Sequence, residues 1–377
     1  MPETAESLSF DENGVCSVCQ QISYKKEKID WNARARELDS LIEQYRGKYD
    51  YDCIVPFSGG KDSTFTLWYL VRVKNLKPLV VCFDHGFLRE QVKLNAERTF
   101  RHLGVDAIRF TPNWKVVRKL MFESLRRRGD FCWHCHTGIF SYPMWVALKF
   151  EVPLLFWGEP GAEYSSFFSY DEKEEADEIR FNRKINLGIN AEDMLGMLDN
   201  TISDYEVTVR DLKPYVFPPM RDLRQANIRS VFLGYYIPWD VKEHVEIIKN
   251  ELCWEEAEVE GVPPQYGYEK IECFLQGVRD YAKYLKRGFG RTTHLCSIDI
   301  RNGRLSREAG ADFVAAFDGR RPKALDQFLD ILGISEEMFV ELLKPHVVTP
   351  HEMPACGNCP MANRVPSDIL DWKPELG

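Results

Sequence analysis

The stretch of this chain that decides its fold is Asp52-Cys-Ile-Val-Pro-Phe-Ser58-Gly59-Gly60-Lys61-Asp62-Ser63-Thr64. A short apolar run ends in a Ser-Gly-Gly turn, and a helix is expected directly after it, over residues 62–74. A strand, a glycine turn and a helix start together present free backbone N–H groups to an anion such as phosphate. The two glycines let the backbone approach that anion closely. Hydroxyl donors and charge come from the side chains of Ser58, Ser63, Thr64 and Lys61.

This stretch is not a Walker A loop, which needs a glycine where Val55 stands and Ser or Thr where Asp62 stands. The pattern S-G-G-x-D-S instead resembles the pyrophosphate-binding loop of the PP-loop ATP pyrophosphatases. Those enzymes split ATP between the α and β phosphates and transfer AMP to an oxygen of the substrate. The alternative is an ordinary strand–turn–helix corner with Asp62 as the helix cap. The convergence of glycines, serines, a lysine and an aspartate at the end of an apolar run favours the loop.

Composition and charge narrow the class of protein. The chain has 377 residues, of which 44% are hydrophobic and 28% charged, so we expect a globular protein with more than one structural unit. Its formal net charge of -9 argues against a nonspecific nucleic-acid binder. We find no signal peptide and no apolar run long enough to span a bilayer, and expect a cytoplasmic protein. Its eleven cysteines are then expected as thiols or metal ligands, not disulfides.

The pattern along the chain predicts three regions: an N-terminal segment over 1–45, a nucleotide-binding core over 46–250 and a helical C-terminal region over 251–377. In the core, apolar runs alternate with helix-like stretches, which predicts an α/β fold with a doubly wound parallel sheet. An insertion that covers the sheet edge is expected over 160–228. The expected strands are 53–57, 78–83, 107–110, 152–157 and 230–237, and the expected helices are 62–74, 91–102, 114–127 and 137–150.

Parallel sheets bind ligands at the carboxyl ends of their strands. The residues expected at those ends are Ser58-Gly59-Gly60, Asp84-His85-Gly86 and Gly158-Glu159. These residues are therefore the first candidates for a binding site.

Three C-x-x-C pairs occur: Cys16/Cys19, Cys132/Cys135 and Cys356/Cys359. One such pair binds a metal through two thiolates, and two pairs complete a tetrahedral zinc site. The alternative is that some are buried cysteines that pack as small hydrophobes. That alternative is preferred for the single cysteines Cys53, Cys82, Cys253, Cys273 and Cys296.

The middle pair is expected near the nucleotide cleft, because it lies between the third strand and the helix that leads into the fourth. His134 and His136 flank Cys135 and could be additional ligands, although a histidine is more often a hydrogen-bonded or surface residue. In PP-loop tRNA-thiolation enzymes a C-x-x-C at a comparable place holds an iron–sulfur cluster.

The chain as a whole resembles the N-acetyl sugar amidotransferases of bacterial surface-polysaccharide and flagellin-sugar biosynthesis. The resemblance covers nearly the whole chain. Its N-terminal carriers are Phe10-Asp-Glu-Asn-Gly-Val-Cys16-Ser-Val-Cys19, the loop 56–63, Asp130-Phe-Cys-Trp-His-Cys-His-Thr-Gly138 and Val152-Pro-Leu-Leu-Phe-Trp-Gly158-Glu159. The later carriers are Phe232-Leu-Gly-Tyr-Tyr-Ile-Pro-Trp239, Gly288-Phe-Gly-Arg-Thr-Thr-His294 and Ile300-Arg301-Asn-Gly-Arg304-Leu-Ser-Arg307.

This resemblance implies a fold, a reaction and partners. The fold is the adenine nucleotide α-hydrolase-like sheet of the PP-loop type. ATP adenylates the acetamido oxygen of an N-acetylated sugar, which is possibly nucleotide-linked, and ammonia then displaces AMP to leave an acetamidino group. A glutaminase subunit supplies the ammonia, and the product serves LPS O-antigen or other surface-sugar biosynthesis. The expected cofactors are ATP and Mg²⁺, with Zn²⁺ on the cysteine pairs.

The resemblance also implies roles for individual residues. Catalytic roles fall to Asp62, Lys61 and Glu159, although Glu159 is about as well explained as a loop carboxylate. ATP would be bound by Ser58, Gly59, Gly60, Asp62, Ser63, Thr64, Phe83, Asp84 and Gly158, with Asp62 acting through Mg²⁺ and Phe83 and Asp84 flanking the adenosine. A basic cluster could grip an anionic part of the substrate or form a solvated charged face; its members are Arg291, His294, Arg301, Arg304 and Arg307.

One departure concerns the N-terminus, where relatives usually carry a further C-x-x-C just before a segment like Met1-Pro-Glu-Thr4. Either this chain starts at what is an internal methionine in its relatives, or Cys16/Cys19 pair with Cys356/Cys359. Two other functions compete with the amidotransferase. They are a PP-loop tRNA sulfurtransferase with a cluster on Cys132/Cys135, and a non-catalytic nucleotide-binding subunit.

Overall fold

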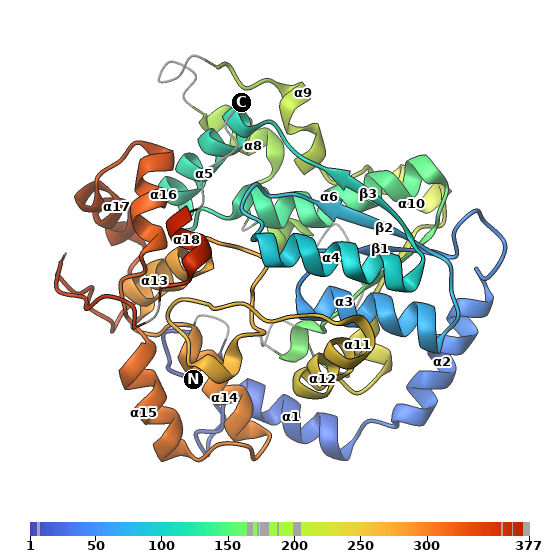
Figure 1. The fold of residues 1–377 in the computed structure, drawn as a ribbon, viewed down its shortest axis with the longest axis horizontal. Helices are drawn as coiled ribbons and strands as arrows, with labels where there is room; N and C mark the ends of the chain where they lie inside the picture. The colour runs from blue at the N-terminus through green and yellow to red at the C-terminus, as the bar shows by residue number, and fades with distance from the viewer. Residues whose placement is uncertain are drawn as a thin grey trace.

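A five-stranded parallel sheet lies at the centre of the fold (Figure 1). The computed structural model describes residues 1–5, 8–163, 169–171, 173, 181–186, 188–198, 205–355, 357–363 and 365–371. The strands are β1 (Cys53–Pro56), β2 (Pro78–Phe83), β3 (Asp106–Phe110), β4 (Leu154–Trp157) and β5 (Arg229–Phe232). Their order is β3-β2-β1-β4-β5, and all neighbours are parallel. The α/β fold and the parallel sheet predicted from the sequence are confirmed.

The strand order reverses between β1 and β4, where Ile54 lies opposite Leu155. The chain moves outward from β1 through β2 to β3, and then returns to the other side of β1 as β4. The loops that leave β1 and β4 therefore run to opposite sides of the sheet and open a crevice between them. Strands β1, β2 and β4 are buried along their whole length, as their unbroken apolar sequences predict for strands covered on both faces.

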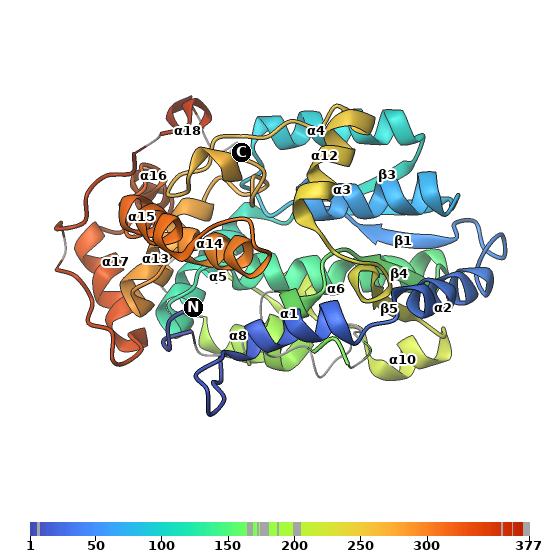
Figure 2. The same cartoon turned by 90° about the horizontal axis from the view of Figure 1, so that it is seen from below.

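Helices cover both faces of the sheet (Figure 2). One face packs against α3, α4 and α12, and Val55 and Phe156 belong to that core. The other face packs against α6 and α10, and Ile54 and Leu155 belong to that core. The bounds of these helices are Lys61–Trp68 for α3, Glu90–Leu103 for α4, Val241–Leu252 for α12, Trp133–Phe150 for α6 and Met220–Gln225 for α10.

A second core lies beside the sheet and is built by α5 (Trp114–Arg128) and by the C-terminal helices α13 (Gln276–Arg287), α16 (Ala324–Leu332), α17 (Glu336–Leu343) and α18 (Ser367–Asp371). Two further C-terminal helices, α14 (Arg291–Arg301) and α15 (Arg307–Phe317), pack against each other. Figure 1 shows the C-terminal helices grouped on one side of the molecule. The other α-helices of the described residues are α1 (Ser17–Glu27), α2 (Trp31–Glu43), α8 (Ala191–Met197), α9 (Val209–Leu212) and α11 (Leu233–Tyr236). The expected insertion 160–228, which holds α8, α9 and α10, lies partly outside the described residues.

Three expected elements differ from the structure. The strand expected over 230–237 ends at Phe232, because a turn of helix, α11, follows; a short apolar run fits a buried helix as well as a strand. The helix expected over 62–74 continues after Trp68 as a π-helical turn, Tyr69–Val73. The helix expected over 137–150 already begins at Trp133, so that Cys135 lies in its first turn.

The chain after residue 250 is less helical than expected. Between α12 and α13 it holds only a 3-10 turn, Pro264–Tyr266, among the described elements. Two prolines and two glycines in this connection, Pro263, Pro264, Gly261 and Gly267, disfavour a continuous helix. No helix in the described part of the chain is both long enough and apolar enough to cross a bilayer.

The packing of α6 on the sheet leads to a stability prediction. A Cβ atom at Gly138 would lie 2.1 Å from Cζ of Phe83, whose ring is packed against Phe110, Tyr142 and Tyr215. Gly138→Ala should therefore lower the free energy of unfolding by about 1–3 kcal/mol, the usual cost of inserting a methyl group into a filled core. Urea unfolding measures this change.

Gly196→Ala is the matched control, because Gly196 also lies in a helix but has nothing within 4 Å of the added methyl group. It should leave stability unchanged or raise it by up to about 1 kcal/mol through helix propensity. Equal stability of the two variants would contradict the packing described for Gly138.

Candidate active site

The loop Ser58-Gly59-Gly60 leaves the carboxyl end of β1 and leads directly into α3. Gly59 has a φ of +83°, and Trp254 Nε1 donates a hydrogen bond of 3.2 Å to its carbonyl. A Cβ at Gly59 would lie 2.5 Å from Val92 Cγ1, so that position requires glycine. Gly60 caps α3 without a side chain, which leaves the first N–H groups of the helix available for an anion.

The hydroxyl groups of Ser58 and Ser63 close this loop into a compact turn. The Ser58 N–H donates to Ser63 Oγ at 3.2 Å, and the Gly60 N–H donates to Ser58 Oγ at 3.3 Å. The Oγ atoms of the two serines lie 3.3 Å apart. Both hydroxyls therefore lie beside the N-terminus of α3, where they could add donors to the backbone N–H groups.

Lys61, the first residue of α3, is buried among carboxylates. Its Nζ lies 2.8 Å from Asp62 Oδ2 and 2.8 Å from Glu269 Oε2, and its side chain is only 2% exposed. Burial disfavours the charged ammonium, but the charges of Asp62, Glu269 and Glu159 outweigh it and raise the pKa of Lys61 well above its usual value. In Glu269, burial raises the pKa of the carboxyl, and the charges of Lys61, Lys270 and Arg291 overcome this and lower it to about 2. Lys61 and Glu269 thus form a charged pair in the interior.

Gly158 and Glu159 follow β4 and face the start of α3. A Cβ at Gly158 would lie 2.7 Å from Thr66 Oγ1 and 3.0 Å from the Asp62 carbonyl oxygen, so glycine lets the end of β4 approach the first turn of α3. Burial, followed by the charge of Asp62, raises the pKa of Glu159 to about 8. Its Oε1 is buried and has no hydrogen-bond partner among the described residues. Glu159 therefore carries a proton near neutral pH and has an oxygen available for a ligand.

A pocket opens at Glu159, which we call the central pocket. Its walls combine aromatic rings, carboxylates and two cationic side chains. It is lined by Glu159, Glu163, Trp239, Asp240, Val241, Lys242, Tyr266, Tyr268, Glu269, Leu295, Ile298, Asp299, Asn302 and Arg304. These residues come from the segment after β4, the N-terminal end of α12, the connection before α13, and α14 with the turn after it, so the pocket lies between the sheet and α14.

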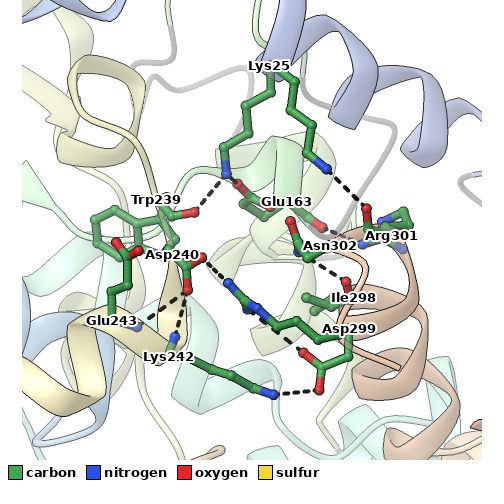
Figure 3. Close-up of polar contacts among 12 residues, drawn as sticks. Lys25, Glu163, Trp239, Asp240, Lys242, Glu243, Ile298, Asp299, Arg301 and Asn302 are labelled. Atoms are coloured by element: carbon green, nitrogen blue, oxygen red, sulfur yellow. Dashed lines mark hydrogen bonds and ion pairs between the residues drawn. The ribbon is translucent and has the colours of Figure 1, made fainter. Parts of the chain in front are cut away.

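Asp299 organises the wall of the central pocket on the side of α14 (Figure 3). Its Oδ2 accepts hydrogen bonds of 2.8 Å from Lys242 Nζ and from the Tyr266 hydroxyl. On the opposite wall, Asp240 caps α12 through the N–H of Lys242 at 3.0 Å and also pairs with Arg304. Lys25 of α1 reaches the pocket from outside, pairing with Glu163 and donating to the Trp239 carbonyl oxygen at 2.7 Å.

Three residues predicted to bind ATP lie beside the loop or behind it. Thr64 is fully buried, and its hydroxyl donates to the Gly60 carbonyl oxygen at 2.8 Å. Phe83 is almost fully buried between β2 and the aromatic rings packed on α6. Asp84 Oδ1 accepts the N–H of Gly86 at 2.9 Å and shapes the turn after β2. Each of these arrangements also has a structural purpose, and nucleotide binding by these residues stays a prediction.

The five residues predicted as one basic cluster occupy separate surroundings. Arg291 is half-buried and pairs with Asp280 at 3.1 Å and with Glu269 at 3.7 Å. Arg304 pairs with Asp240 and lines the central pocket. Arg301 donates to Ser297 Oγ at 2.7 Å, and Arg307 is exposed at the start of α15. Burial, with Lys283 and Arg291 nearby, lowers the pKa of His294 well below its usual value, so this histidine is neutral at pH 7.

The cysteine pairs are also separated. The Sγ atoms of Cys16 and Cys19 lie 3.4 Å apart. Burial raises the pKa of the Cys19 thiol, and the nearby charge of Arg301 opposes this rise. Cys132 precedes α6 and belongs to the second core. The half-buried cysteines Cys135, Cys273 and Cys359 pack against the edge of that core. Burial raises the pKa of the Cys132 and Cys135 thiols, and the Cys273 thiol lies close enough to raise both further.

The described residues contain no group of three or more His, Cys, Asp or Glu side chains that could hold a metal ion. Cys356 lies outside the described residues. His134 is buried and His136 half-buried near the middle pair, and burial lowers the pKa of each to about 3. The described part of the chain therefore does not fit a zinc site, and zinc stays a prediction from the spacing of the pairs.

The site fits a Mg²⁺-bound polyphosphate better than a bare anion. The N–H groups at the start of α3 and the two serine hydroxyls are suited to phosphate oxygens, whereas the carboxylates of Asp62 and Glu269 both pair with a single lysine, Lys61. This excess of carboxylates would repel a bare polyphosphate, and carboxylate oxygens are the protein ligands that Mg²⁺ accepts. Asp62, half-buried at the loop, has the right chemistry for that ligand.

Sequence reasoning missed the residues that the connection before α13 brings to the loop. Glu269 pairs with Lys61, and Glu272 lies so close to the loop that a Cβ at Gly60 would be 2.7 Å from its Oε2. Tyr266 and Tyr268 line the central pocket. The only local signal was the run of aromatic and charged residues Tyr266-Gly-Tyr-Glu-Lys-Ile-Glu272 between two prolines and a helix.

Comparison with known proteins gives two matches. Residues 264–353 match the family model of the LPS biosynthesis protein WbpG-like, C-terminal domain. The chain is also 26% identical over 131 residues to an uncharacterized protein of Methanocaldococcus jannaschii, MJ1599; the match covers 34% of this chain and 44% of that protein. The family match includes Tyr266, Tyr268, Glu269, Asp299 and Arg304 of the central pocket. It supports a role for this chain in LPS biosynthesis.

Proposed function

We propose that this chain is an ATP-dependent amidotransferase that converts the N-acetyl group of a sugar into an acetamidino group in LPS O-antigen or other surface-sugar biosynthesis. The observation that carries the proposal is the meeting of two strand ends at the switch point of the sheet. There the glycine loop after β1 faces Glu159 after β4, and Glu159 opens onto the central pocket. The reaction consumes ATP, so we assign it to the cytoplasm, and a glutaminase subunit supplies the ammonia.

The chemistry explains why ATP is needed. An amide carbon is a poor electrophile, and its oxygen is a poor leaving group. In the first step the amide oxygen attacks the α-phosphorus of ATP, and pyrophosphate leaves. In the second step ammonia attacks the activated carbon, AMP leaves with the former amide oxygen, and a proton is released. Positioning of the reacting groups and stabilisation of phosphate charge then supply most of the rate.

The residues of the loop would hold the pyrophosphate half of ATP. The N–H groups at the start of α3, with Ser58 and Ser63, would bind its oxygens, and Lys61 would add a positive charge held in place by Glu269. A bound Mg²⁺ would offset the charge of the nearby carboxylates and of the phosphates. Asp62 would be its protein ligand.

The central pocket has the composition of a sugar site. Trp239, Tyr266 and Tyr268 offer flat apolar rings, while Asp240, Asp299 and Asn302 offer hydrogen-bond acceptors and donors. Glu159 lies between this pocket and the loop, where the acetamido group would have to meet the α-phosphorus. With a pKa of about 8, its protonated carboxyl could donate a hydrogen bond to the oxygen that leaves with AMP.

The loop assignment predicts the products of the reaction. With ammonium, MgATP and a panel of N-acetylated sugars, free and nucleotide-linked, the chain should form AMP and pyrophosphate, because the loop would hold the β and γ phosphates together. Asp62→Asn and Ser58→Ala should each lower this rate by about tenfold or more, the effect of losing one charge-assisted or positioning contact. Chromatography of the nucleotides measures the products, and circular dichroism should show an unchanged fold.

Release of ADP and phosphate would refute the assignment. The nitrogen donor provides an internal control: the single chain should use ammonium and should not use glutamine. Efficient use of glutamine by the purified chain would remove the need for a partner.

MgATP should also raise the melting temperature of the wild type, and Asp62→Asn should lose that rise even without a sugar.

The buried carboxyl of Glu159 predicts a pH dependence of stability. Burial and Asp62 raise its pKa in the folded chain from 4.5 to about 8, so the folded state binds a proton that the unfolded state releases. The contribution of Glu159 to the free energy of unfolding is fully present below pH 4.5, and it is lost as the pH rises to about 8. Glu159→Gln should therefore match the wild type near the lower pH and be more stable near the higher one.

Urea unfolding at the two pH values measures this difference. Glu97→Gln is the matched control, because Glu97 is exposed on α4. Its stability relative to the wild type should be the same at both pH values. A Glu159→Gln variant less stable than the wild type at the higher pH would show that the carboxylate is stabilised in the folded chain.

A second candidate is a PP-loop sulfurtransferase acting on tRNA, which would hold an iron–sulfur cluster at Cys132 and Cys135. Cys273 is a third thiol near this pair, but the described residues form no metal-binding group of three such side chains, which disfavours the cluster. The absorption spectrum of anaerobically purified protein separates the two candidates. A brown protein, with the visible band of an iron–sulfur cluster, would favour the sulfurtransferase, and we expect a colourless protein.

A further inference from the structure

Two glutamates enter the central pocket from the segment that follows β4. Both Glu159 and Glu163 line the pocket, and Glu163 ends a 3-10 turn, Gly161–Glu163. The Glu163 N–H donates a hydrogen bond of 3.2 Å to the Pro160 carbonyl oxygen, which closes this turn. Pro160 itself packs against α11, because a Cβ at Gly234 would lie only 2.2 Å from its Cδ. The backbone between the two glutamates is therefore held in place.

The carboxyl group of Glu163 is buried and held by two donors (Figure 3). It forms an ion pair with Lys25 and accepts a hydrogen bond from the Tyr170 hydroxyl. Lys25 also donates to the Trp239 carbonyl oxygen at 2.7 Å, so its ammonium is anchored by two acceptors. The carboxyl group of Glu163 is therefore present as a carboxylate, the form that a neighbouring ammonium stabilises.

Glu163 differs in one respect from three other carboxylates of the central pocket. Asp240, Asp299 and Glu269 each contact a cation or a backbone N–H group through both of their carboxyl oxygens. In Glu163, both contacts within the described residues reach the same oxygen, Oε1. Its Oε2 is therefore the oxygen that remains for a ligand in the pocket.

The two glutamates of this segment are in opposite protonation states. Burial and the charge of Asp62 raise the pKa of Glu159 to about 8, so its carboxyl is protonated near neutral pH. Glu163 is a carboxylate paired with Lys25. A pocket with one protonated and one ionised carboxyl group can supply an acid and a base to the same reaction. Displacement of AMP by ammonia uses both, an acid at the departing oxygen and a base at the arriving nitrogen.

We propose that Glu163 is the general base that takes a proton from the attacking ammonia, and that Lys25 of α1 positions it. This assignment rests on the proposed function and concerns its second step. The lone pair of ammonia forms a bond to the carbon of the adenylated amide, and one proton of the new C–N⁺ group passes to Oε2 of Glu163. The bond between that carbon and the former amide oxygen then breaks, AMP leaves with the electron pair, and Glu163 returns its proton to solvent.

The charge of Glu163 also suits the change of charge in this step. Ammonia is neutral, but its nitrogen becomes positive as it bonds to carbon. A carboxylate that Lys25 and Tyr170 already hold in place stabilises that charge as it forms. The first step does not involve ammonia, so the loss of a base for ammonia should spare it.

The two steps can be measured separately with Glu163→Gln, which removes the base but keeps an oxygen for Lys25 and Tyr170. The first step is followed without ammonium, as the exchange of labelled pyrophosphate into ATP that depends on a sugar from the panel of N-acetylated sugars. The whole reaction is followed with ammonium, as formation of the acetamidino sugar by mass spectrometry. Glu163→Gln should keep the exchange within about twofold and lower product formation by about a hundredfold, as expected for a lost general base. Glu27→Gln, exposed on α1, is the matched control and should resemble the wild type in both assays.

The outcomes separate this proposal from the proposed function. Exchange without product formation in Glu163→Gln supports Glu163 as the base. An equal loss of both would assign Glu163 to the shape of the pocket, and an unchanged rate of product formation would exclude it. Either result overturns the proposal and leaves the amidotransferase intact. Absence of sugar-dependent exchange in the wild type would overturn the proposed function, and this assignment with it.

A less basic nucleophile provides a second measurement. Hydroxylamine is largely unprotonated at neutral pH, and after attack its nitrogen loses a proton to water more readily than the nitrogen of ammonia does. The loss of rate caused by Glu163→Gln should therefore be about tenfold smaller with hydroxylamine than with ammonium. An equal loss with both nucleophiles would contradict proton transfer to Glu163.

Lys25 acts through Glu163, so its variants test the positioning. Lys25→Met should lower product formation by about tenfold, and Lys25→Arg, which keeps the charge, should recover most of it. Both should keep the sugar-dependent exchange, which a general loss of folding would not allow. Lys28→Met removes an exposed lysine directly after α1 and is the matched control. Equal product formation by Lys25→Met and the wild type would remove Lys25 from the site.

Discussion

The pair between Lys61 and Glu269 is the interaction on which the rest of the site depends. Two side chains that are each only 2% exposed meet at 2.8 Å, one from the start of α3 and one from the connection before α13. A buried charge without its partner is strongly unfavourable, whereas a paired one is tolerated. The pair therefore fixes the C-terminal region against the glycine loop, and the central pocket forms between them because they are held at this distance.

The strands and the parallel sheet could be predicted from local sequence, because the strands are unbroken apolar runs; the strand order, and with it the switch point, came only from the structure. The glycine loop was recognisable for the same reason: its strand, turn and helix start are adjacent in sequence. Glu269, Asp280 and Lys283 could not be predicted, since they lie more than two hundred positions after Lys61 and belong to no repeated spacing. The connection before α13 brings Glu269 to the loop, and α13 brings Asp280 and Lys283 beside Arg291.

Residue type alone predicted that the basic residues would lie together and that the cysteine pairs would meet, but the fold separates them. The arginines expected as one basic cluster are divided among acidic partners, Asp280 for Arg291 and Asp240 for Arg304. The cysteine pairs follow the same pattern, because Cys132 is buried in the second core while Cys16 and Cys19 lie beside Arg301. Spacing along a chain indicates which residues can act together, but burial and the nearest opposite charge decide which of them do.

The position of Arg291 between two carboxylates has a further consequence. Its guanidinium is shared by Asp280 of α13 and by Glu269 on the side of the loop. A change that moved Arg291 toward Asp280 would weaken its hold on Glu269 and leave Glu269 more fully to Lys61. A change of charge at the loop would in the same way alter the pairing of Arg291 with Asp280. One arginine thus links the electrostatics of the loop to those of α13.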